Sequence, residues 1–312
     1  MAVSAPRGVT AYRGLAARTR AYVGLTIATA CWASAFVLGK VVLREMTPLV
    51  LATWRYVVAT LVLLPVVLRA RAVAPPGRAI PPGVALPLTA MVVSGGVLYP
   101  WLFLASLART SAANASLLIA LNPIVTLLLL PFVGERLARM QVLGAAVAFA
   151  GAVLVISRGD LGELLGLRID AGDLMALAAA ACWATFNLTS RLVVDRLPAA
   201  TVNLAVYAGG AIALGVLGLG DGPIVQLAHA TPPVLAAVVA MAVLSSVVAG
   251  QLFLDGVRDA GVGRAVVFIY LVPVLTALMS FAVLGEGLST PQVAGGATVL
   301  TGLMLATRSA AR

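Results

Sequence analysis

Long apolar runs recur along this chain, and short segments rich in charge, proline and glycine separate them. A helix needs about twenty mostly apolar residues to cross a bilayer, and backbone groups in lipid must bond within their own segment. The sequence therefore predicts ten transmembrane helices. They cover residues 22–43, 48–68, 84–107, 111–131, 138–157, 171–193, 198–219, 232–254, 261–284 and 290–307.

The composition points the same way. Of the 312 residues, 62% are hydrophobic and only 10% are charged, whereas about a quarter of the residues of a soluble domain are charged. A soluble chain of this length could not cover so much apolar surface with polar groups. We therefore expect an all-α, multi-pass integral membrane protein that contacts the lipid bilayer, in a bacterial inner membrane.

The basic residues predict how the chain is oriented. With the N-terminus inside, fifteen of the 21 Lys and Arg fall on cytoplasmic segments and five on outer ones, and Arg55 lies within a span. Positive charge accumulates on cytoplasmic loops, so we expect both termini to be cytoplasmic. The basic residues are spread over six segments without interleaved aromatic residues, which argues against a nucleic-acid partner.

The second half of the sequence repeats the first at an offset of about 150 residues. The matches are Ala30-Cys31-Trp32-Ala33 with residues 181–184, Lys40 with Arg191, Pro123 with Pro273, Gly134-Glu135 with Gly285-Glu286, and Gln141 to Gly144 with Gln292 to Gly295. Each half holds five predicted spans. Because five is odd, the second copy enters the membrane upside down, as in the inverted repeats of secondary transporters.

The repeat predicts the domain organisation. We expect a basic cytoplasmic segment, two inverted five-helix repeats joined by a loop, and a short tail. These parts are residues 1–21, 22–157, 158–170, 171–307 and 308–312, with the repeats at 22–157 and 171–307.

These motifs resemble the drug/metabolite transporter superfamily, in its EamA-type branch. The paired Ala-Cys-Trp-Ala segments, Trp54-Arg55-Tyr56 in the second span and the proline-containing spans carry the resemblance, which covers essentially the whole chain. It implies ten helices in two halves and a transporter rather than an enzyme. Within the branch the chain is similar to YddG-type exporters, which implies outward movement of aromatic and other neutral amino acids.

Aromatic and polar residues near the middle of the spans predict where a substrate binds. Polar side chains at this depth favour the bundle interior over lipid, and aromatic walls suit neutral or zwitterionic cargo. Ordinary helix packing explains each residue equally well when it is taken singly. The predicted substrate-binding residues are Trp32, Ser34, Tyr99, Trp101, Asn122, Trp183, Asn187, Ser245, Ser246, Gln251 and Tyr270.

Glycine and proline within spans predict places where helices bend. The predicted hinge residues are Gly95, Gly96, Pro100, Pro123, Gly250 and Pro273. Small residues in spans five and ten, such as Gly144 and Gly302, predict close helix packing. These two spans are either scaffold or a dimer surface, so a monomer and a homodimer both remain open.

Arg55 lies about seven residues, on the order of 10 Å, from the outer end of the second span. Two interpretations remain open. In one, Arg55 contacts a substrate carboxylate or forms a gate. In the other, its side chain reaches toward the interface or caps backbone carbonyls of a neighbouring helix.

Other functional classes find little support. The spans hold no aspartate pair and no nucleophile motif, and the two cysteines and single histidine lack metal-ligand spacing, so we expect no catalytic residues, metal or cofactor. The sequence has no phosphate-binding loop of a pump. A channel is disfavoured by the two-half duplication. Export of other metabolites or drugs by proton antiport remains an alternative to facilitated exchange of amino acids.

Overall fold

The computed structural model describes residues 7–73, 81–107, 109, 118–135, 137–160, 162, 171–284 and 287–308, and all regular secondary structure among them is helical. In this part, eight helices are long and apolar enough to cross a membrane, and Asn122–Val133 is a shorter apolar helix. The prediction of an all-α protein is thus confirmed for the described residues. Ten membrane-crossing helices and cytoplasmic termini remain predictions.

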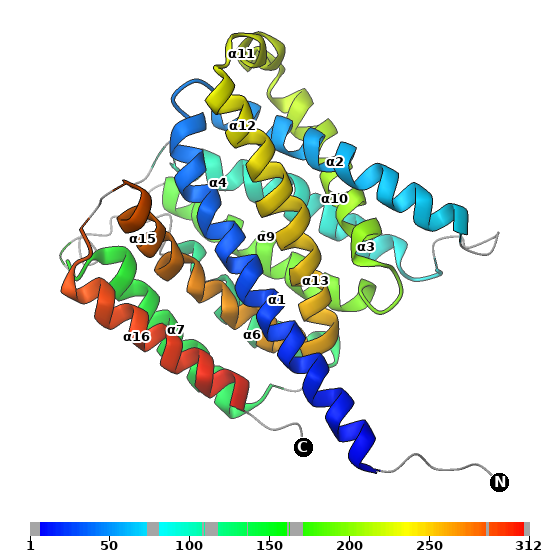
Figure 1. Ribbon diagram of the computed structural model, residues 1–312, viewed down its shortest axis with the longest axis vertical. Helices are drawn as coiled ribbons and strands as arrows, with labels where there is room; N and C mark the ends of the chain where they lie inside the picture. The colour runs from blue at the N-terminus through cyan, green and yellow to red at the C-terminus, as the bar shows by residue number, and fades with distance from the viewer. Residues whose placement is uncertain are drawn as a thin grey trace.

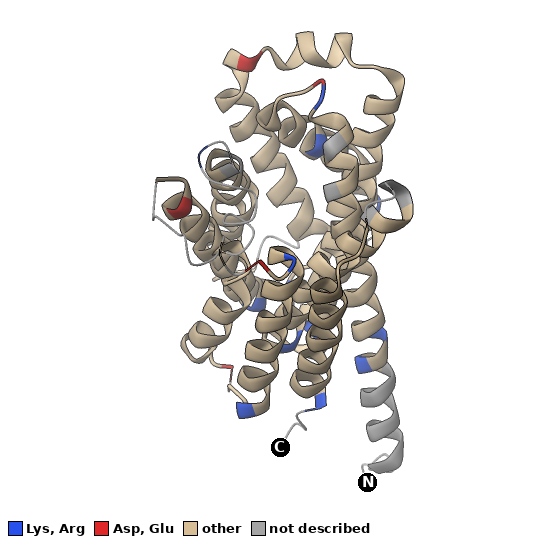
Figure 2. Ribbon diagram, turned by 90° about the vertical axis from the view of Figure 1, so that its left-hand side faces the viewer, with Lys and Arg blue, Asp and Glu red and all other residues tan. Residues whose placement is uncertain are grey.

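The helices form one bundle in which the start of α1 and the end of α16 lie at the same end (Figures 1 and 2). The first half contains α1 (Arg7–Val42), α2 (Pro48–Val73), α3 (Ala85–Met91), η1 (Val92–Leu98), α4 (Tyr99–Leu107), α6 (Asn122–Leu129), η2 (Leu130–Val133) and α7 (Arg139–Ser157). Helix α1 begins well before the predicted first span because no proline interrupts residues 7–42, so the basic N-terminal segment continues into the same helix.

The second half follows a similar order with additional short elements. It contains α9 (Ala171–Val193), α10 (Ala199–Leu217), η3 (Leu219–Asp221), α11 (Pro223–His229), α12 (Pro232–Met241), η4 (Ala242–Val248), α13 (Ala249–Ala260), α14 (Val262–Ala265), η5 (Val266–Tyr270), α15 (Leu271–Leu284) and α16 (Thr290–Arg308). Prolines open α2, α11 and α12, where their missing N–H costs no helical hydrogen bond.

Helix contacts are reciprocal between the halves. Helix α1 packs on α13 as α9 packs on α4, and α1 packs on α15 as α9 packs on α6. The pairs α2 with α10 and α7 with α16 join each helix to its own counterpart. Such reciprocal pairing is what an approximate two-fold relation between the halves produces.

Four glycines allow α7 and α16 to cross at very short range. A Cβ atom added at Gly144 would lie 2.5 Å from the carbonyl oxygen of Gly302, and one added at Gly151 would lie 2.6 Å from that of Gly295. Small residues permit this approach of two backbones. The glycine faces predicted in spans five and ten therefore join the two halves of one chain.

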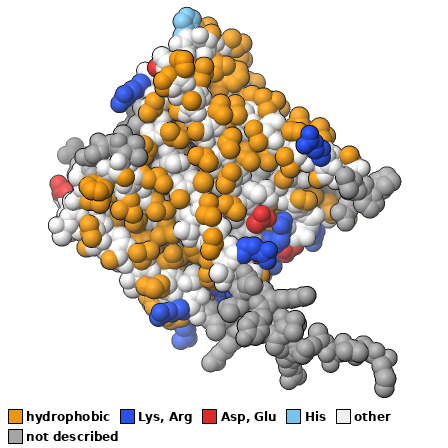
Figure 3. Space-filling view, in the orientation of Figure 1, with side chains coloured by type: hydrophobic (Ala, Val, Ile, Leu, Met, Phe, Trp, Pro, Cys, Tyr) orange, Lys and Arg blue, Asp and Glu red, His pale blue; other side chains and the backbone are white. Residues whose placement is uncertain are grey.

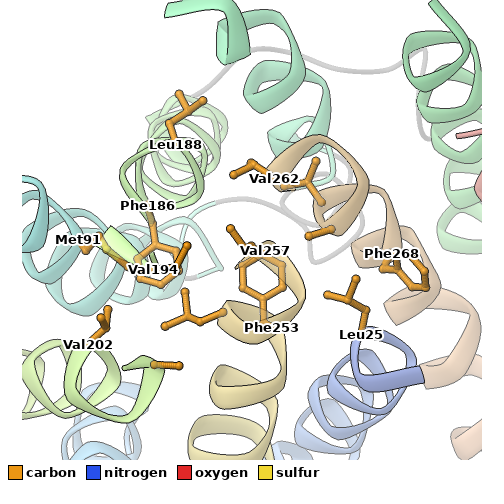
Figure 4. Packing of buried hydrophobic residues seen from close by; sticks show 14 of the residues in the cluster. Leu25, Met91, Phe186, Leu188, Val194, Val202, Phe253, Val257, Val262 and Phe268 are labelled. Carbon is orange, nitrogen blue, oxygen red and sulfur yellow. The ribbon is translucent and has the colours of Figure 1, made fainter. Parts of the chain in front are cut away.

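Hydrophobic side chains form both the interior and much of the outer surface. Phe253 of α13 is 1% exposed and lies between Leu25 of α1 and Phe186 of α9 (Figure 4). On the outside, hydrophobic side chains cover most of the face in Figure 3, and Leu86, Phe132 and Ile212 are each more than two-thirds exposed. A surface this apolar is stable in lipid rather than in water.

Candidate functional site

Two helices of the bundle contain a seven-residue π-helical segment at equivalent positions in the two halves. These segments are η1 (Val92–Leu98) and η4 (Ala242–Val248), which lie 150 residues apart. A π-helical segment replaces the i−4 ladder of hydrogen bonds by an i−5 ladder, and such segments are frequent at functional sites. The two π-helical segments therefore mark a candidate functional site.

The predicted hinge residues lie in or beside irregular helix. Gly95 and Gly96 are within η1, Pro100 follows it in α4, and Gly250 is the second residue of α13 after η4. Pro123 lies in the first turn of α6, and Pro273 follows the 3₁₀ segment η5. The π-helical and 3₁₀ segments give the other five positions the geometry that bending requires, whereas Pro123 only begins a regular helix. The motion of all six remains a prediction.

The glycines of η1 bring that helix directly onto its neighbours. A Cβ atom at Gly96 would lie 2.7 Å from the backbone carbonyl oxygen of Val206 in α10, and one at Gly95 would collide with the ring of Phe186. Any larger residue would push η1 away from α9 and α10. The two glycines therefore set the spacing of helices from both halves.

Three predicted aromatic residues come together beside these segments. The rings of the repeat-equivalent residues Trp32 and Trp183 lie 6.2 Å apart at 80°, and the ring of Tyr99 lies 4.7 Å from that of Trp183. Edge-to-face arrangements of this kind are favourable for aromatic pairs. We call Trp32, Tyr99 and Trp183 the aromatic cluster. It draws on both halves of the chain.

Three phenylalanines that the sequence analysis missed surround this cluster. Phe103 stacks on Tyr99, with ring centres 6.1 Å apart. Phe186 stacks on Trp183 at 4.9 Å, and Phe253 lies 5.3 Å from Trp32. A phenylalanine in an apolar span has no polar atom to distinguish it from an ordinary core residue. Only the position of Phe186, one helical turn from Trp183, could have indicated its role.

The η4 segment accepts hydrogen bonds from two aromatic side chains. Trp32 Nε1 donates to the carbonyl oxygen of Ser245 over 3.0 Å, and the Tyr207 hydroxyl donates to that of Ser246 over 2.7 Å. The Ser245 hydroxyl donates to Met241 of its own helix. The predicted residues Ser245 and Ser246 thus contribute backbone acceptors, and Tyr207 is a further residue that the sequence analysis missed.

Asn122 and Asn187, both predicted, meet in a buried amide network. Asn187 Nδ2 donates to Asn122 Oδ1 over 3.4 Å and to Thr126 Oγ1 over 3.2 Å. Asn187 Oδ1 is buried without a hydrogen-bond partner among the described residues. The network joins α6 of the first half to α9 of the second and leaves one buried amide oxygen without a partner among the described residues.

The other four predicted residues make none of the ring contacts or hydrogen bonds described above. Gln251 Nε2 donates to Asp255 Oδ2, and the ring of Tyr270 lies 6.2 Å from Phe149. The Ser34 hydroxyl donates to the carbonyl of Cys31, and 42% of Trp101 is exposed. Their part in substrate binding remains a prediction.

A charged network lies at the end of the bundle where α7 begins and α16 ends. Arg191 Nε lies 3.0 Å from Glu135 Oε1, and Arg191 also pairs with Asp195. Glu135 accepts a hydrogen bond from the amide of Val262. These contacts link the first half to two segments of the second half. They border a cavity of about 310 Å³ whose wall includes Gly83, Glu135, Arg191 and Asp195.

A family model covers both halves of this structure. The EamA-like transporter family matches residues 19–157 and again residues 170–308. The chain belongs to the EamA-like transporter family. This EamA protein is therefore a multi-pass membrane transporter whose two family repeats correspond to the two halves that pack reciprocally in the bundle.

Curated relatives of this EamA protein are also described as transporters. It is 33% identical to an uncharacterized transporter of Bacillus subtilis over 66% of this chain and 67% of the relative. It is 29% identical to a probable terminal-alkyne amino-acid exporter of Streptantibioticus cattleyicolor, covering 93% and 94%. It is 26% identical to a probable amino-acid metabolite efflux pump of Salmonella typhimurium, covering 88% and 90%.

A solved crystal structure shares the fold. It superimposes on this EamA protein with a TM-score of 0.76 at 22% identity, covering 94% of this chain and 99% of the other. The aromatic cluster takes Trp32 and Tyr99 from the first family repeat and Trp183 from the second. Secondary transporters with internal repeats place their substrate sites at such a repeat interface.

Proposed function

We propose that this EamA transporter exports aromatic and other neutral amino acids by alternating access. The observation that carries the proposal is the aromatic cluster, in which equivalent tryptophans from the two repeats meet at 6.2 Å beside two π-helical segments. A site shared by two similar halves supports exchange between two packings, each open to one side of the membrane.

The chemistry of the cluster supports a neutral, partly apolar cargo. Aromatic rings pack on aromatic and aliphatic side chains, and an ammonium group is attracted to a ring face. A multiply charged anion would need several cations at mid-depth, and Arg55 is the one Lys or Arg that the sequence places well inside a span. Two relatives whose names refer to amino-acid export agree with this choice of cargo.

The proposal includes ten membrane-crossing helices, in a bacterial inner membrane, with both chain ends in the cytoplasm. In this orientation the network of Glu135, Arg191 and Asp195 lies at the cytoplasmic end. Its contacts between the two halves then hold that end closed, and they must separate before cargo enters from the cytoplasm.

Replacing Glu135 by glutamine should favour opening of the cytoplasmic end. The substitution keeps the shape of the side chain and removes its charge, so Arg191 loses its partner from the first half. A partly exposed ion pair contributes up to about 1 kcal/mol, so the population ratio should change by up to about fivefold. Spin labels at the exposed positions Arg139 of the first half and Leu192 of the second would report this as a larger share of long distances.

The matched control is Asp255→Asn, which removes an ion pair with Arg258 inside the single helix α13. This change should leave the distance distribution as it is in the unsubstituted protein. If Glu135→Gln also leaves it unchanged, the pair does not hold the cytoplasmic end closed.

The cargo is tested by ligand-induced stabilisation of the purified protein. A ligand that binds only the folded state adds about 2.7 kcal/mol to its stability at a concentration one hundred times its dissociation constant. Phenylalanine, leucine and threonine should raise the unfolding temperature, whereas glucose 6-phosphate and glutamate should not. Stabilisation by glucose 6-phosphate alone, or by none of the amino acids, would contradict the proposed cargo.

A further inference from the structure

Arg55 is a half-buried cation within helix α2. Its Nε atom is buried and has no hydrogen-bond partner among the described residues. The ion pairs found among the described residues are formed by other arginines, such as Arg191 and Arg258. A charged side chain within a membrane span is costly, and where one is found it commonly marks a functional pathway. Arg55 therefore requires a reason beyond helix packing.

The contacts of Arg55 lead to η4, the π-helical segment to which Trp32 of the aromatic cluster donates a hydrogen bond. Helix α2 packs on α10 and on η4. The guanidinium carbon of Arg55 lies 5.1 Å from the ring centre of Tyr56, whose ring lies 5.0 Å from that of Tyr207. Tyr207 in turn donates its hydroxyl proton to η4. Arg55 thus lies within two ring contacts of this segment.

Helix α2 also contacts the first half's part of the cluster. It packs on α4, which begins at Tyr99, and Tyr99 is in ring contact with Trp183. A side chain that reached for the interface would keep its head group in water, whereas the Nε atom here is buried. The arrangement favours a role inside the bundle over the interfacial alternative.

We infer that Arg55 binds the carboxylate of the transported amino acid. This inference rests on the proposed function. The guanidinium presents paired N–H donors in a planar fork that matches a carboxylate. The neighbouring rings of Tyr99 and Trp183 accept the apolar side chain of the same molecule. The site then distinguishes a zwitterion from an amine that lacks a carboxylate, which an aromatic cluster alone does not do.

The test compares phenylalanine with 2-phenylethylamine, which has the same ring and amine but no carboxylate. In proteoliposomes, each unlabelled compound competes with labelled phenylalanine, and in a parallel series with labelled 2-phenylethylamine. In Arg55→Met the half-saturation concentration for phenylalanine should rise about 10- to 100-fold, as expected for loss of a charged hydrogen bond. The half-saturation concentration for 2-phenylethylamine should rise less than twofold or fall. Arg55→Lys keeps the positive charge without the planar fork of N–H donors. Its half-saturation concentration for phenylalanine should lie between those of the unsubstituted protein and Arg55→Met.

Thermal unfolding without ligand separates a binding role from a structural one. A binding cation without a partner in the empty protein destabilises it, so Arg55→Met should unfold at the same temperature as the unsubstituted protein or higher. If Arg55 instead had a structural role, Arg55→Met would unfold at a lower temperature than the unsubstituted protein. Arg308→Met, which removes an exposed arginine at the end of α16, is the matched control and should change neither measurement.

The outcomes are distinguishable. If the unsubstituted protein exchanges no amino acid, the proposed function fails and the inference fails with it. If the unsubstituted protein exchanges phenylalanine and Arg55→Met does so with an unchanged half-saturation concentration, only the inference is overturned. Equal weakening of both ligands, or a lower unfolding temperature in both Arg55→Met and Arg55→Lys, also overturns it.

Discussion

Gly302→Ala is expected to destabilise the transporter strongly, although alanine is the better helix former. A Cβ atom at this position would lie 2.5 Å from the carbonyl oxygen of Gly144 and 2.8 Å from the Cα atom of Ala148. Backbone cannot move aside as a side chain can, so α7 and α16 must separate. Overpacking of this kind costs about 3 kcal/mol, and the unfolding temperature should fall by roughly 5–10 °C.

The neighbouring Gly296 provides a control on the same helix. A Cβ atom there would meet only the side chain of Val274, at 3.3 Å. Gly296→Ala should therefore leave the unfolding temperature unchanged or raise it slightly, because alanine is favoured over glycine in a helix by about 1 kcal/mol. Equal losses in the two variants would show that the crossing does not depend on Gly302 in particular.

Trp183→Ala is expected to cause the largest loss of transport. Trp183 is in ring contact with Trp32, Tyr99 and Phe186, so its removal opens the aromatic cluster at its centre. Loss of its contact area and ring interactions with the cargo should cost about 2–3 kcal/mol of binding. The half-saturation concentration for phenylalanine in proteoliposomes should rise by roughly 30- to 150-fold, and Trp183→Phe should recover part of the loss.

Trp54→Ala controls for the general cost of losing a tryptophan from the bundle. Trp54 donates its indole N–H to the carbonyl of Pro223 and takes part in none of the ring contacts of the cluster. The Trp54→Ala substitution should change the half-saturation concentration for phenylalanine by less than threefold. A similar effect in both variants would mean that Trp183 acts through stability alone.

The repeat made the central part of the site predictable. Ala-Cys-Trp-Ala occurs twice in one register, and a two-fold relation between the halves brings equivalent first helices to the middle together. Trp32 meets Trp183, and Asn122 meets Asn187, and the sequence had placed all four residues near the middle of their spans. Apolar run lengths likewise predicted the positions of the eight membrane-length helices in the described part of the chain, because lipid sets a minimum length for a span. Residues 111–117 of the predicted fourth span lie outside the described residues.

The remaining features depend on geometry that residue type does not encode. Hydropathy does not distinguish an i−4 ladder from an i−5 ladder, so η1 and η4 were not predicted from the sequence. The pairing of Tyr56 with Tyr207 joins spans that lie far apart in sequence. Trp101 has the residue type and depth of a site residue, but its side chain is 42% exposed, since neither feature fixes the direction in which a helix faces.

The most direct test of the account is counter-flow in proteoliposomes loaded with unlabelled amino acids, with labelled phenylalanine, threonine or a sugar phosphate added outside. In an alternating-access carrier, the binding site can return to the outside with an internal amino acid bound. Internal amino acid should therefore accelerate uptake of labelled phenylalanine and threonine, and this uptake should saturate. The sugar phosphate should show neither effect. Uptake of phenylalanine that rises linearly with concentration and is unaffected by internal amino acid, or no amino-acid uptake by folded protein, would contradict the account.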